Sequence, residues 1–274
     1  MTSKKPLAVF TRYFILTVIA IIIAFPYLWM IISSFRPGSE IAVKGSFLPS
    51  EWRIENYPEA MAMAPYGRFF INSIIVAALT VVAQLITCPL AAFAFAKMNF
   101  KSRNFLFNIF LCTMMIPAES TIISNYLTMA SLKLTDTYFA IIAPSLTSMF
   151  SIFLLRQFFK SIPDALLEAA TIDGANLMQT FTKVVLPLST SAIATVIIFG
   201  FVNSWNSYLW PTLVTTKIER RTIQTGLRYM INADLGTDWP KIMAASTVII
   251  LPILVLFVCL QKYFVQGITK VGLK

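Results

Sequence analysis

The chain has 274 residues, of which 57% are hydrophobic and only 12% are charged. Soluble domains are about 25% charged, and the 23 Phe residues are more than a water-exposed surface carries. This composition excludes a disordered chain, a disulfide-rich secreted domain and a soluble α/β enzyme, and it predicts an all-α, polytopic membrane protein. The chain has no His, so we expect no metal site and no His-based catalysis.

Six apolar runs approach or exceed the roughly 20 residues that a helix needs to cross the hydrocarbon core. They predict a single transmembrane domain over residues 1–274, with spans at 13–35, 69–96, 104–127, 138–156, 188–213 and 242–261. The first run is too long for the apolar core of a signal peptide, so we expect it to remain as an uncleaved span.

The basic residues predict the orientation, because Lys and Arg are enriched in cytoplasmic loops. The connection 97–103 has three basic residues in seven, whereas 118–137 has only Lys133. We therefore expect both termini in the cytoplasm. The net charge of +10 is attributed to basic residues near anionic membrane lipid. Nucleic acid is excluded as a partner, because no loop combines a basic patch with exposed aromatic residues.

Apart from Glu119 in the 104–127 span and Arg156 at the end of the 138–156 span, the predicted spans contain no charged residue, whereas ion-coupled transporters and proton pumps depend on intramembrane charges. A pathway for a neutral, hydroxyl-rich solute is expected. No G-x-x-x-x-G-K-[ST] motif is present, so the chain is not expected to be an enzyme, and energy for uphill transport would come from another subunit. The alternative is a stand-alone secondary transporter or channel, which would show intramembrane charges, an internal repeat or a selectivity loop.

The connection 157–187 differs from the other predicted cytoplasmic loops by its length and its helical pattern. Residues 161–164 (SIPD) have the spacing of a capping box, with proline in the first turn of a two-turn helix. Gly174 is expected to end this helix in the left-handed conformation, and a second short helix is expected from about Asn176. A lipid-bound amphipathic pair is the alternative, but the alanine-rich face suits close packing in a protein groove.

Within this loop, Glu168-Ala169-Ala170, Gly174 and Val184-Val185-Leu186-Pro187 have the spacing E-A-A-x3-G-x9-I-x-L-P. The loop resembles the EAA loop of permease subunits in binding-protein-dependent ABC importers, with Val184 in place of Ile. The rest of the chain is similar to the shorter of the two sister permeases in carbohydrate-uptake systems. The short motifs that carry this likeness include Phe70-Ile-Asn72-Ser73, Ala94-Phe-Ala-Lys97, Leu134-Thr-Asp136-Thr137, Trp205-Asn206 and Gln261-Lys-Tyr263-Phe264.

The resemblance implies one half of a translocation pore in the cytoplasmic membrane of a prokaryote. Its partners would be a sister permease, two ATPase subunits that bind ATP and magnesium, and an external solute-binding protein, and the chain would hold no cofactor itself. The solute would be a sugar or oligosaccharide, with a polyol or glycerol phosphate as the alternative. The ATPase-coupling interface would comprise Glu168, Ala169, Ala170, Asp173, Gly174, Leu186 and Pro187, and the candidate contacts with the binding protein are Arg220, Arg221, Arg228 and Trp239.

Polar and aromatic residues of the fifth span indicate a possible solute pathway. Four of them would share one face of a continuous helix, at i, i+3, i+4 and i+7: Asn203, Asn206, Ser207 and Trp210. Trp205 and Tyr208 flank this face, and Gln84 is a weaker candidate in the second span. Amides beside an aromatic plate would suit a sugar ring, whereas hydrogen bonds between helices and an interfacial aromatic belt are the alternative roles.

Overall fold

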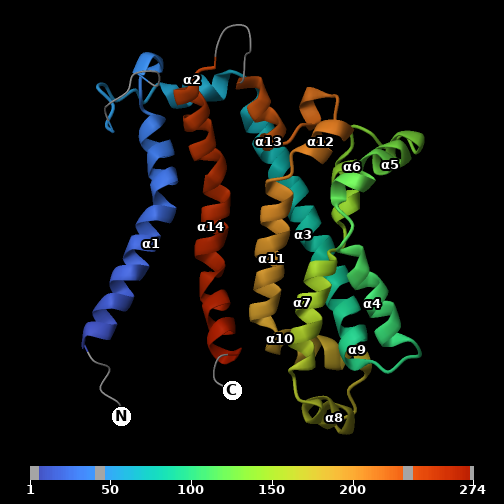
Figure 1. Cartoon of the computed structure of the whole chain (residues 1–274). Helices are drawn as coiled ribbons and strands as arrows, with labels where there is room; N and C mark the ends of the chain where they lie inside the picture. Colours follow the sequence, from blue (N-terminus) through green and yellow to red (C-terminus); the bar gives the residue numbers. More distant parts are fainter. Residues whose placement is uncertain (1–5, 41–46, 231–236, 272–274) are drawn as a thin grey trace. The chain divides into compact units, whose positions relative to one another are not determined.

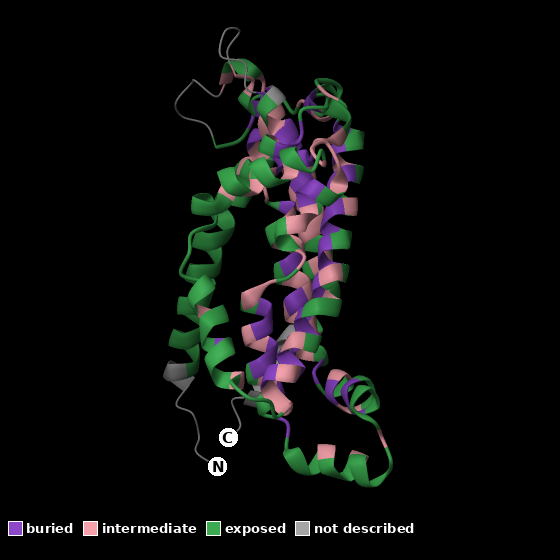
Figure 2. Ribbon diagram, turned by 90° about the vertical axis from the view of Figure 1, so that its right-hand side faces the viewer, coloured by how far each residue is buried: buried purple, intermediate pink, exposed green. Residues whose placement is uncertain are grey.

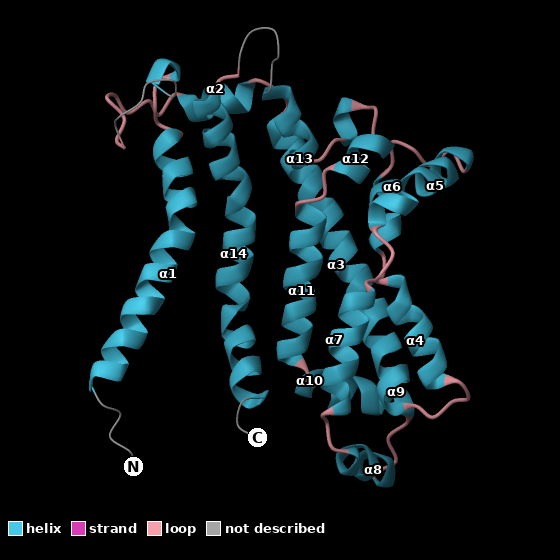
Figure 3. Cartoon of the chain, in the orientation of Figure 1, coloured by secondary structure: helices cyan, strands magenta, loops and turns pink. Residues whose placement is uncertain are grey.

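The computed structural model describes residues 6–40, 47–230 and 237–271. Over these residues the chain is helical and contains no β-strand (Figures 1 and 3), which confirms the predicted all-α class. The sequence predicts a single domain, whereas the structure divides into two compact units. One unit comprises Met1–Tyr66 and Leu227–Leu251, and the other comprises Gly67–Gly226 and Pro252–Lys274.

Among the described residues, three helices are long and apolar enough to cross a membrane, and up to six spans result if each bent helix pair counts as one. The three helices are Val9–Ser33, Tyr66–Lys97 and Trp239–Tyr263. The bent pairs are Arg103–Thr113 with Ala118–Ser131, Tyr138–Ser145 with Met149–Lys160, and Leu177–Leu188 with Thr190–Trp205.

The first unit contains a helix that packs against almost nothing. In α1 (Pro6–Ser33) the most apolar window has a mean hydropathy of 2.6 and no buried residue, and Figure 2 shows long stretches of helix coloured as exposed. Such a surface is suited to lipid, which is as apolar as the side chains it meets.

The remaining elements of the first unit gather near the end of α1. They are η1 (Gly38–Glu40), α2 (Asn56–Ala62), η5 (Leu227–Met230) and the first part of α14 (Trp239–Val271). The buried Asn56 amide donates to the carbonyls of Ser34 and Arg36, both at 2.9 Å. Lys241 at the start of α14 forms an ion pair with Glu59 of α2 at 3.0 Å. The side chains of residues 264–269, part of the C-terminal motif, lie outside the described ones.

The second unit packs around α3 (Tyr66–Lys97), α7 (Met149–Lys160) and α11 (Thr190–Trp205). One buried apolar cluster lies toward the Lys97 end of α3, where these helices approach the 157–187 connection, and includes Phe93, Leu155, Phe159, Val185 and Val196. A second cluster, around Val76 and Val214, lies toward the other end of α3.

Three of the predicted continuous spans are interrupted. The 104–127 span is α4 (Arg103–Thr113) followed by α5 (Ala118–Ser131), with a bend of 92° between them. The 138–156 span consists of α6 (Tyr138–Ile142) and η2 (Ala143–Ser145), bent by 45° from α7. The 188–213 span ends its first helix at Trp205 and resumes as α12 (Leu209–Val214).

Proline accounts for two of these breaks. A proline lacks an N–H group, and its ring clashes with the carbonyl four residues earlier. Pro117 follows the end of α4, and Pro211 lies in the first turn of α12, just after the interruption. Proline alone does not decide the outcome, because Pro26, Pro89 and Pro252 lie inside uninterrupted helices.

Candidate functional site

The 157–187 connection, which we call the coupling loop, begins with α8 (Asp164–Ile172). The predicted capping box at its start is wrong. The Ser161 hydroxyl donates to the carbonyl of Phe158 at 2.7 Å, and no side chain caps the helix. Pro163 stands at the N-cap position, where its extended backbone directs the chain into the first turn. The helix thus starts through proline geometry and not through a side-chain hydrogen bond.

Gly174 ends α8 in the predicted left-handed conformation, with φ +82°. The N–H of Ala175 bonds to the carbonyl of Ala170 at 2.9 Å, and the N–H of Gly174 bonds to that of Thr171 at 3.0 Å. This pair of bonds is a Schellman motif, which satisfies the last carbonyls of a helix. A Cβ at Gly174 would meet no atom within 4 Å, so only the backbone conformation requires glycine here.

The second helix of the coupling loop begins after Asn176, as predicted. Asn176 and Gln179 form a capping box: the Gln179 N–H donates to Asn176 Oδ1 at 2.9 Å, and the Asn176 N–H donates to Gln179 Oε1 at 2.8 Å. The helical run continues through α9 (Leu177–Thr180), a π-helical turn η3 (Phe181–Val185) and α10 (Leu186–Leu188). Pro187 lies inside α10, and the chain turns at Ser189 before α11.

Lys97, the last residue of α3, holds the start of the coupling loop. Its Nζ donates to the carbonyl of Ile162 and to Oδ1 of Asp164, both at 2.6 Å. The Lys97 side chain is only 6% exposed, whereas that of Asp164 is 77% exposed. A nearly buried ammonium group therefore links a long helix to the beginning of α8.

Most of the predicted interface residues face outward from the loop. Glu168, Ala169, Asp173, Gly174 and Pro187 are exposed, and Ala170 and Leu186 are partly exposed. Figure 1 shows α8 beyond the ends of α7 and α9. Glu168 also lines a cleft of about 1060 Å³ together with Lys97 and Arg103. Its carboxylate forms no ion pair with another described residue, so it remains available to a partner.

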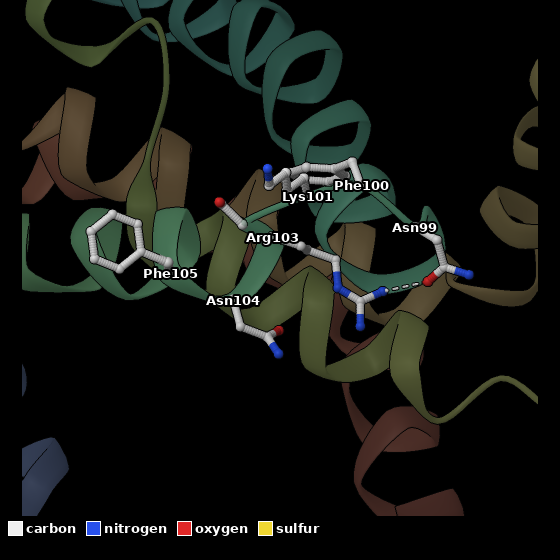
Figure 4. A pocket seen from close by; sticks show the side chains of 7 residues that line it. Asn99, Phe100, Lys101, Arg103, Asn104 and Phe105 are labelled. Carbon is white, nitrogen blue, oxygen red and sulfur yellow. Dashed lines mark hydrogen bonds between the residues drawn. The ribbon is translucent and has the colours of Figure 1, made fainter.

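A second hollow lies at the turn between α3 and α4, over Asn99–Phe105 (Figure 4). Arg103 bonds within this turn, to the carbonyl of Met98 at 2.9 Å and to Oδ1 of Asn99 at 3.3 Å. The residues that line the hollow are consecutive in the chain. The hollow is a feature of the turn itself and brings no distant residues together.

A smaller pocket of about 200 Å³ lies between α3, the break before α7, and α11; we call it the Gln84 pocket. The lining carries amides and hydroxyls and has no charged residue. It consists of Val76, Thr80, Gln84, Ile141, Pro144, Ser145, Thr147, Ser148, Gly200, Asn203, Ser204 and Ser207.

Side chains of α3 stabilise the break between η2 and α7. Gln84 Nε2 donates to the carbonyl of Ser145 at 2.9 Å, and the Thr87 hydroxyl donates to that of Leu146 at 3.0 Å. The N–H of Ser148 donates to Cys88 Sγ at 3.4 Å. Interrupted membrane helices leave backbone groups that neighbouring helices must satisfy, and these three side chains do so from successive turns of α3.

The predicted solute face in the fifth span does not exist as one face. Because α11 ends at Trp205 and Asn206 is its C-cap residue, the helical spacing from Asn203 to Trp210 is lost. Asn203 and Ser207 do line the Gln84 pocket, together with Gln84 itself. The sequence pattern identified three of the lining residues while misplacing the geometry that brings them together.

The other predicted pathway residues have structural contacts. Trp205 is 1% exposed and lies 5.4 Å from the Phe70 ring and 5.5 Å from the Phe201 ring. Trp210 Nε1 donates to the carbonyls of Ala140 and Ile141, at 3.0 and 3.1 Å. The side chains of Asn206 and Tyr208 are exposed. Asn206 Oδ1 accepts a hydrogen bond from Gln224 at 3.4 Å.

The loop after α12 is anchored to the beginning of α3. Asn72 Nδ2 donates to the carbonyls of Glu219 and Arg221 at 2.9 and 2.8 Å, and its Oδ1 accepts from the Tyr138 hydroxyl at 2.7 Å. Arg220 lies over the Tyr138 ring, with 4.6 Å from the guanidinium carbon to the ring centre. Of the predicted contacts with a binding protein, Arg220 and Arg221 are partly buried in the second unit. Arg228 and Trp239 are exposed and belong to the first unit.

Residues 87–270 match the family of binding-protein-dependent transport system inner membrane components. The chain belongs to this family. The match includes the coupling loop and the segments on both sides of it, so the permease is a multi-pass inner-membrane transport subunit.

Curated relatives match the permease over nearly its whole length. The sn-glycerol-3-phosphate transport system permease protein UgpE of Brucella abortus (strain 2308) is 33% identical, over 98% of this chain and 99% of the relative. The arabinooligosaccharides transport system permease protein AraQ of Halalkalibacterium halodurans is 34% identical, over 93% of each chain.

A crystal structure of a bacterial ABC transporter involved in the import of the acidic polysaccharide alginate contains a similar chain. Its TM-score with the permease is 0.82 at 25% sequence identity, over 96% of this chain and 99% of that one. The similarity of both sequence and fold therefore extends far beyond the coupling loop.

Some residues of these sites are not identified by reasoning from the sequence. Lys97 belongs to one of the short family motifs, but its bonds to Ile162 and Asp164 join residues more than 60 positions apart and are not visible in the sequence. Gly200 had a usable signal: a glycine inside an apolar helix costs about 1 kcal/mol relative to alanine and often marks close packing. No group of three His, Cys, Asp or Glu side chains that could hold a metal occurs in the part of the chain that the structure describes.

Proposed function

We propose that the permease forms one half of the pore of an ATP-driven importer for a sugar or oligosaccharide. It would pair with a sister permease, receive solute from an external binding protein and act on two ATPase subunits that hold ATP and magnesium. The arabinooligosaccharides relative and the alginate transporter structure support this solute class. The second candidate is a polyol or glycerol phosphate, and the sn-glycerol-3-phosphate relatives support glycerol phosphate. The permease would have no ATPase site of its own, and both termini would lie in the cytoplasm.

The observation that carries this proposal is the shape of the coupling loop. The loop is a helix–turn–helix that is stabilised by its own capping hydrogen bonds. It exposes Glu168 and Ala169 and partly exposes Ala170. Lys97 links it directly to α3. In our proposal α8 contacts a groove on an ATPase, Glu168 meets a basic residue there, and closure of the ATPases moves α3 through the Lys97 link.

The solute-pathway residues divide into two groups under this proposal. Gln84, Asn203 and Ser207 line a pocket and are the favoured solute contacts. Solute contact by Trp205, Asn206, Tyr208 and Trp210 stays a prediction, as does contact of the binding protein with Arg220, Arg221, Arg228 and Trp239.

Affinity purification of the full-length permease from its native membrane tests the assembly. We expect a second permease and an ATPase to be recovered with it, and the reconstituted complex to hydrolyse ATP faster when the external binding protein carries solute. A permease that is recovered alone and transports solute without ATP would contradict the proposal and favour a stand-alone carrier.

A further inference from the structure

Gln84, which lines the pocket, carries an acceptor atom without a hydrogen-bond partner among the described residues. Gln84 is only 6% exposed, and its Oε1 is buried and has no hydrogen-bond partner among the described residues. The amide orientation is fixed, because Nε2 donates to the Ser145 carbonyl at 2.9 Å and a flipped amide would bring two oxygens together. Buried polar groups are almost always paired, so this oxygen calls for a donor from a bound molecule.

Gly200 on α11 has no side chain, and the Gln84 amide lies where the Cβ of a larger residue would be. A Cβ built at Gly200 would lie 2.7 Å from Gln84 Oε1 and 3.6 Å from its Cδ, closer to the oxygen than real contacts allow. Any larger residue would displace the amide from the Ser145 carbonyl or push Oε1 away from its position. Glycine at this position therefore preserves the placement of the acceptor.

The surrounding groups are those that bind hydroxyls. Thr80, Ser145, Ser204 and Ser207 contribute hydroxyl groups to the lining, and Asn203 contributes an amide. Each can both donate and accept a hydrogen bond, as the hydroxyl groups of a sugar or polyol do.

The lining contains no Lys or Arg that could pair with a phosphate. The N-terminus of α7 (Met149–Lys160) lies beside the lining residue Ser148, but the Ser148 hydroxyl already accepts from the N–H of Ser151 there, at 3.2 Å. The chemistry of the pocket therefore favours a neutral ligand over a phosphorylated one.

We propose that the Gln84 pocket is a solute subsite in this permease, which binds one neutral, hydroxyl-bearing unit whose hydroxyl donates to Gln84 Oε1. The proposal rests on the proposed transport function and adds the solute class and the residues that select it. The volume of about 200 Å³ is below the roughly 300–1,000 Å³ of pockets for drug-sized ligands. It therefore holds a single ring or a short polyol and not a whole oligosaccharide.

The solute class is tested first. The importer's external binding protein is titrated with arabinotriose, maltose, glucose, glycerol, sn-glycerol 3-phosphate and glucose 6-phosphate while its melting temperature is followed. We expect a neutral compound to raise the melting temperature. A response to phosphorylated compounds alone would overturn the neutral subsite and leave the importer function standing.

The subsite itself is tested with the whole importer in proteoliposomes and the compound so identified. The readout is solute imported per ATP hydrolysed, because general damage lowers both rates together whereas a lost solute contact lowers import more. Gln84→Met removes the acceptor at nearly constant volume, and we expect the ratio to fall about two- to tenfold, the effect of one hydrogen bond. Gly200→Ala, which displaces the amide, should lower the ratio in the same direction.

Thr87→Val is the matched control. It removes the neighbouring bond from α3 to the same helix break, at Leu146, and Thr87 does not line the pocket. We expect this variant to keep the wild-type ratio. If Gln84→Met and Gly200→Ala both keep the wild-type ratio, or if Thr87→Val lowers it equally, the residues support the helix break alone and the subsite is disproved. If Gln84→Met fails to assemble, the result for Gly200→Ala decides.

Discussion

The coupling loop and the Gln84 pocket are held together by different kinds of contact. In the loop, the decisive bonds join residues three to five positions apart, such as Ala170 with Ala175 and Asn176 with Gln179. Around the pocket, they join residues about 60 positions apart, such as Gln84 with Ser145. The loop can therefore keep its shape while it moves as a unit, whereas the pocket exists only while α3 and the α7 break stay in register.

This difference suits the two proposed roles. A docking element must present the same surface throughout a transport cycle, and local capping bonds provide that constancy. A solute subsite must form and then release its ligand as the pore changes conformation. Hydrogen bonds between separate helices allow this, because they break when the helices move apart. The bonds from Lys97 of α3 to Ile162 and Asp164 are the long-range exception at the loop, and in our proposal they couple the two regions.

The largest effect is expected from Glu168→Lys, which reverses the charge on the exposed face of α8. A repelled docking pair costs several kcal/mol of association, so uptake should fall by at least about 100-fold and the ATPase should no longer be recovered with the permease. Glu51→Lys, at an exposed acidic residue outside the candidate spans, is the matched control and should retain both. Normal uptake with the ATPase retained would remove α8 as the coupling surface.

Removing the long-range link should have the next largest effect. Lys97→Met deletes an ammonium group that makes two hydrogen bonds of 2.6 Å, and bonds to charged groups contribute about 1.5–3 kcal/mol. We expect uptake to fall about tenfold with the ATPase still bound, measured as initial uptake rate alongside recovery of the complex.

Asp164→Asn distinguishes the loss of the Asp164 charge from the loss of the whole Lys97 anchor. The amide oxygen can still accept from Lys97, and the bond to the Ile162 carbonyl persists, so the loss should be clearly smaller than for Lys97→Met. Equal losses in the two variants would show that the charge of Asp164, and not the anchoring of the loop, is what matters.

Substitutions at Gly174 test the backbone conformation of the turn separately from side-chain contacts. Because a Cβ would find open space there, Gly174→Val acts only through strain at φ +82°, about 1–3 kcal/mol. We expect a several-fold loss of solute-stimulated ATP hydrolysis at nearly normal expression. Gly174→Asn, which tolerates the left-handed conformation, should recover most of the activity. Full activity of the valine variant would show that the turn is not required.

The smallest effect is expected at Asp136, which joins the α5–α6 turn to Thr216 and Lys217. Its burial alone would raise its pKa, but hydrogen bonds from Thr216 and Lys217 outweigh burial and lower the pKa from 3.8. A carboxylate with a lowered pKa stabilises the fold above its unfolded pKa, and the stabilisation is lost as the pH falls through the folded value.

Asp136→Asn should therefore lower the melting temperature by a few degrees at neutral pH, and the difference from the wild type should shrink as the pH falls below about 4. Asparagine tolerates the positive φ of 61° at this position, so the backbone turn is preserved in the comparison. A difference that is independent of pH would show that the charge of Asp136 does not contribute.

Several structural features that depend on residues close together in the sequence were predicted correctly. The left-handed Gly174, the start of the helix after Asn176 and the apolar helices all follow from local pattern and length. The fifth-span face was wrong, because the interruption at Asn206 depends on Pro211 and on bonds such as that from Trp210 to the Ala140 carbonyl. The bonds of Lys97 and Gln84 were out of reach for the same reason: their partners are brought close only by packing.

The helix α3 carries a fixed attachment at each end. Asn72 holds the backbone at Glu219 and Arg221, and 25 residues later Lys97 holds the start of the coupling loop. At 1.5 Å per residue these attachments are about 38 Å apart, which exceeds the thickness of a hydrocarbon core of about 30 Å. One continuous helix, with Pro89 inside it, thus joins the 219–221 segment to the start of α8 across the bilayer, so we expect a displacement at either end to reach the other.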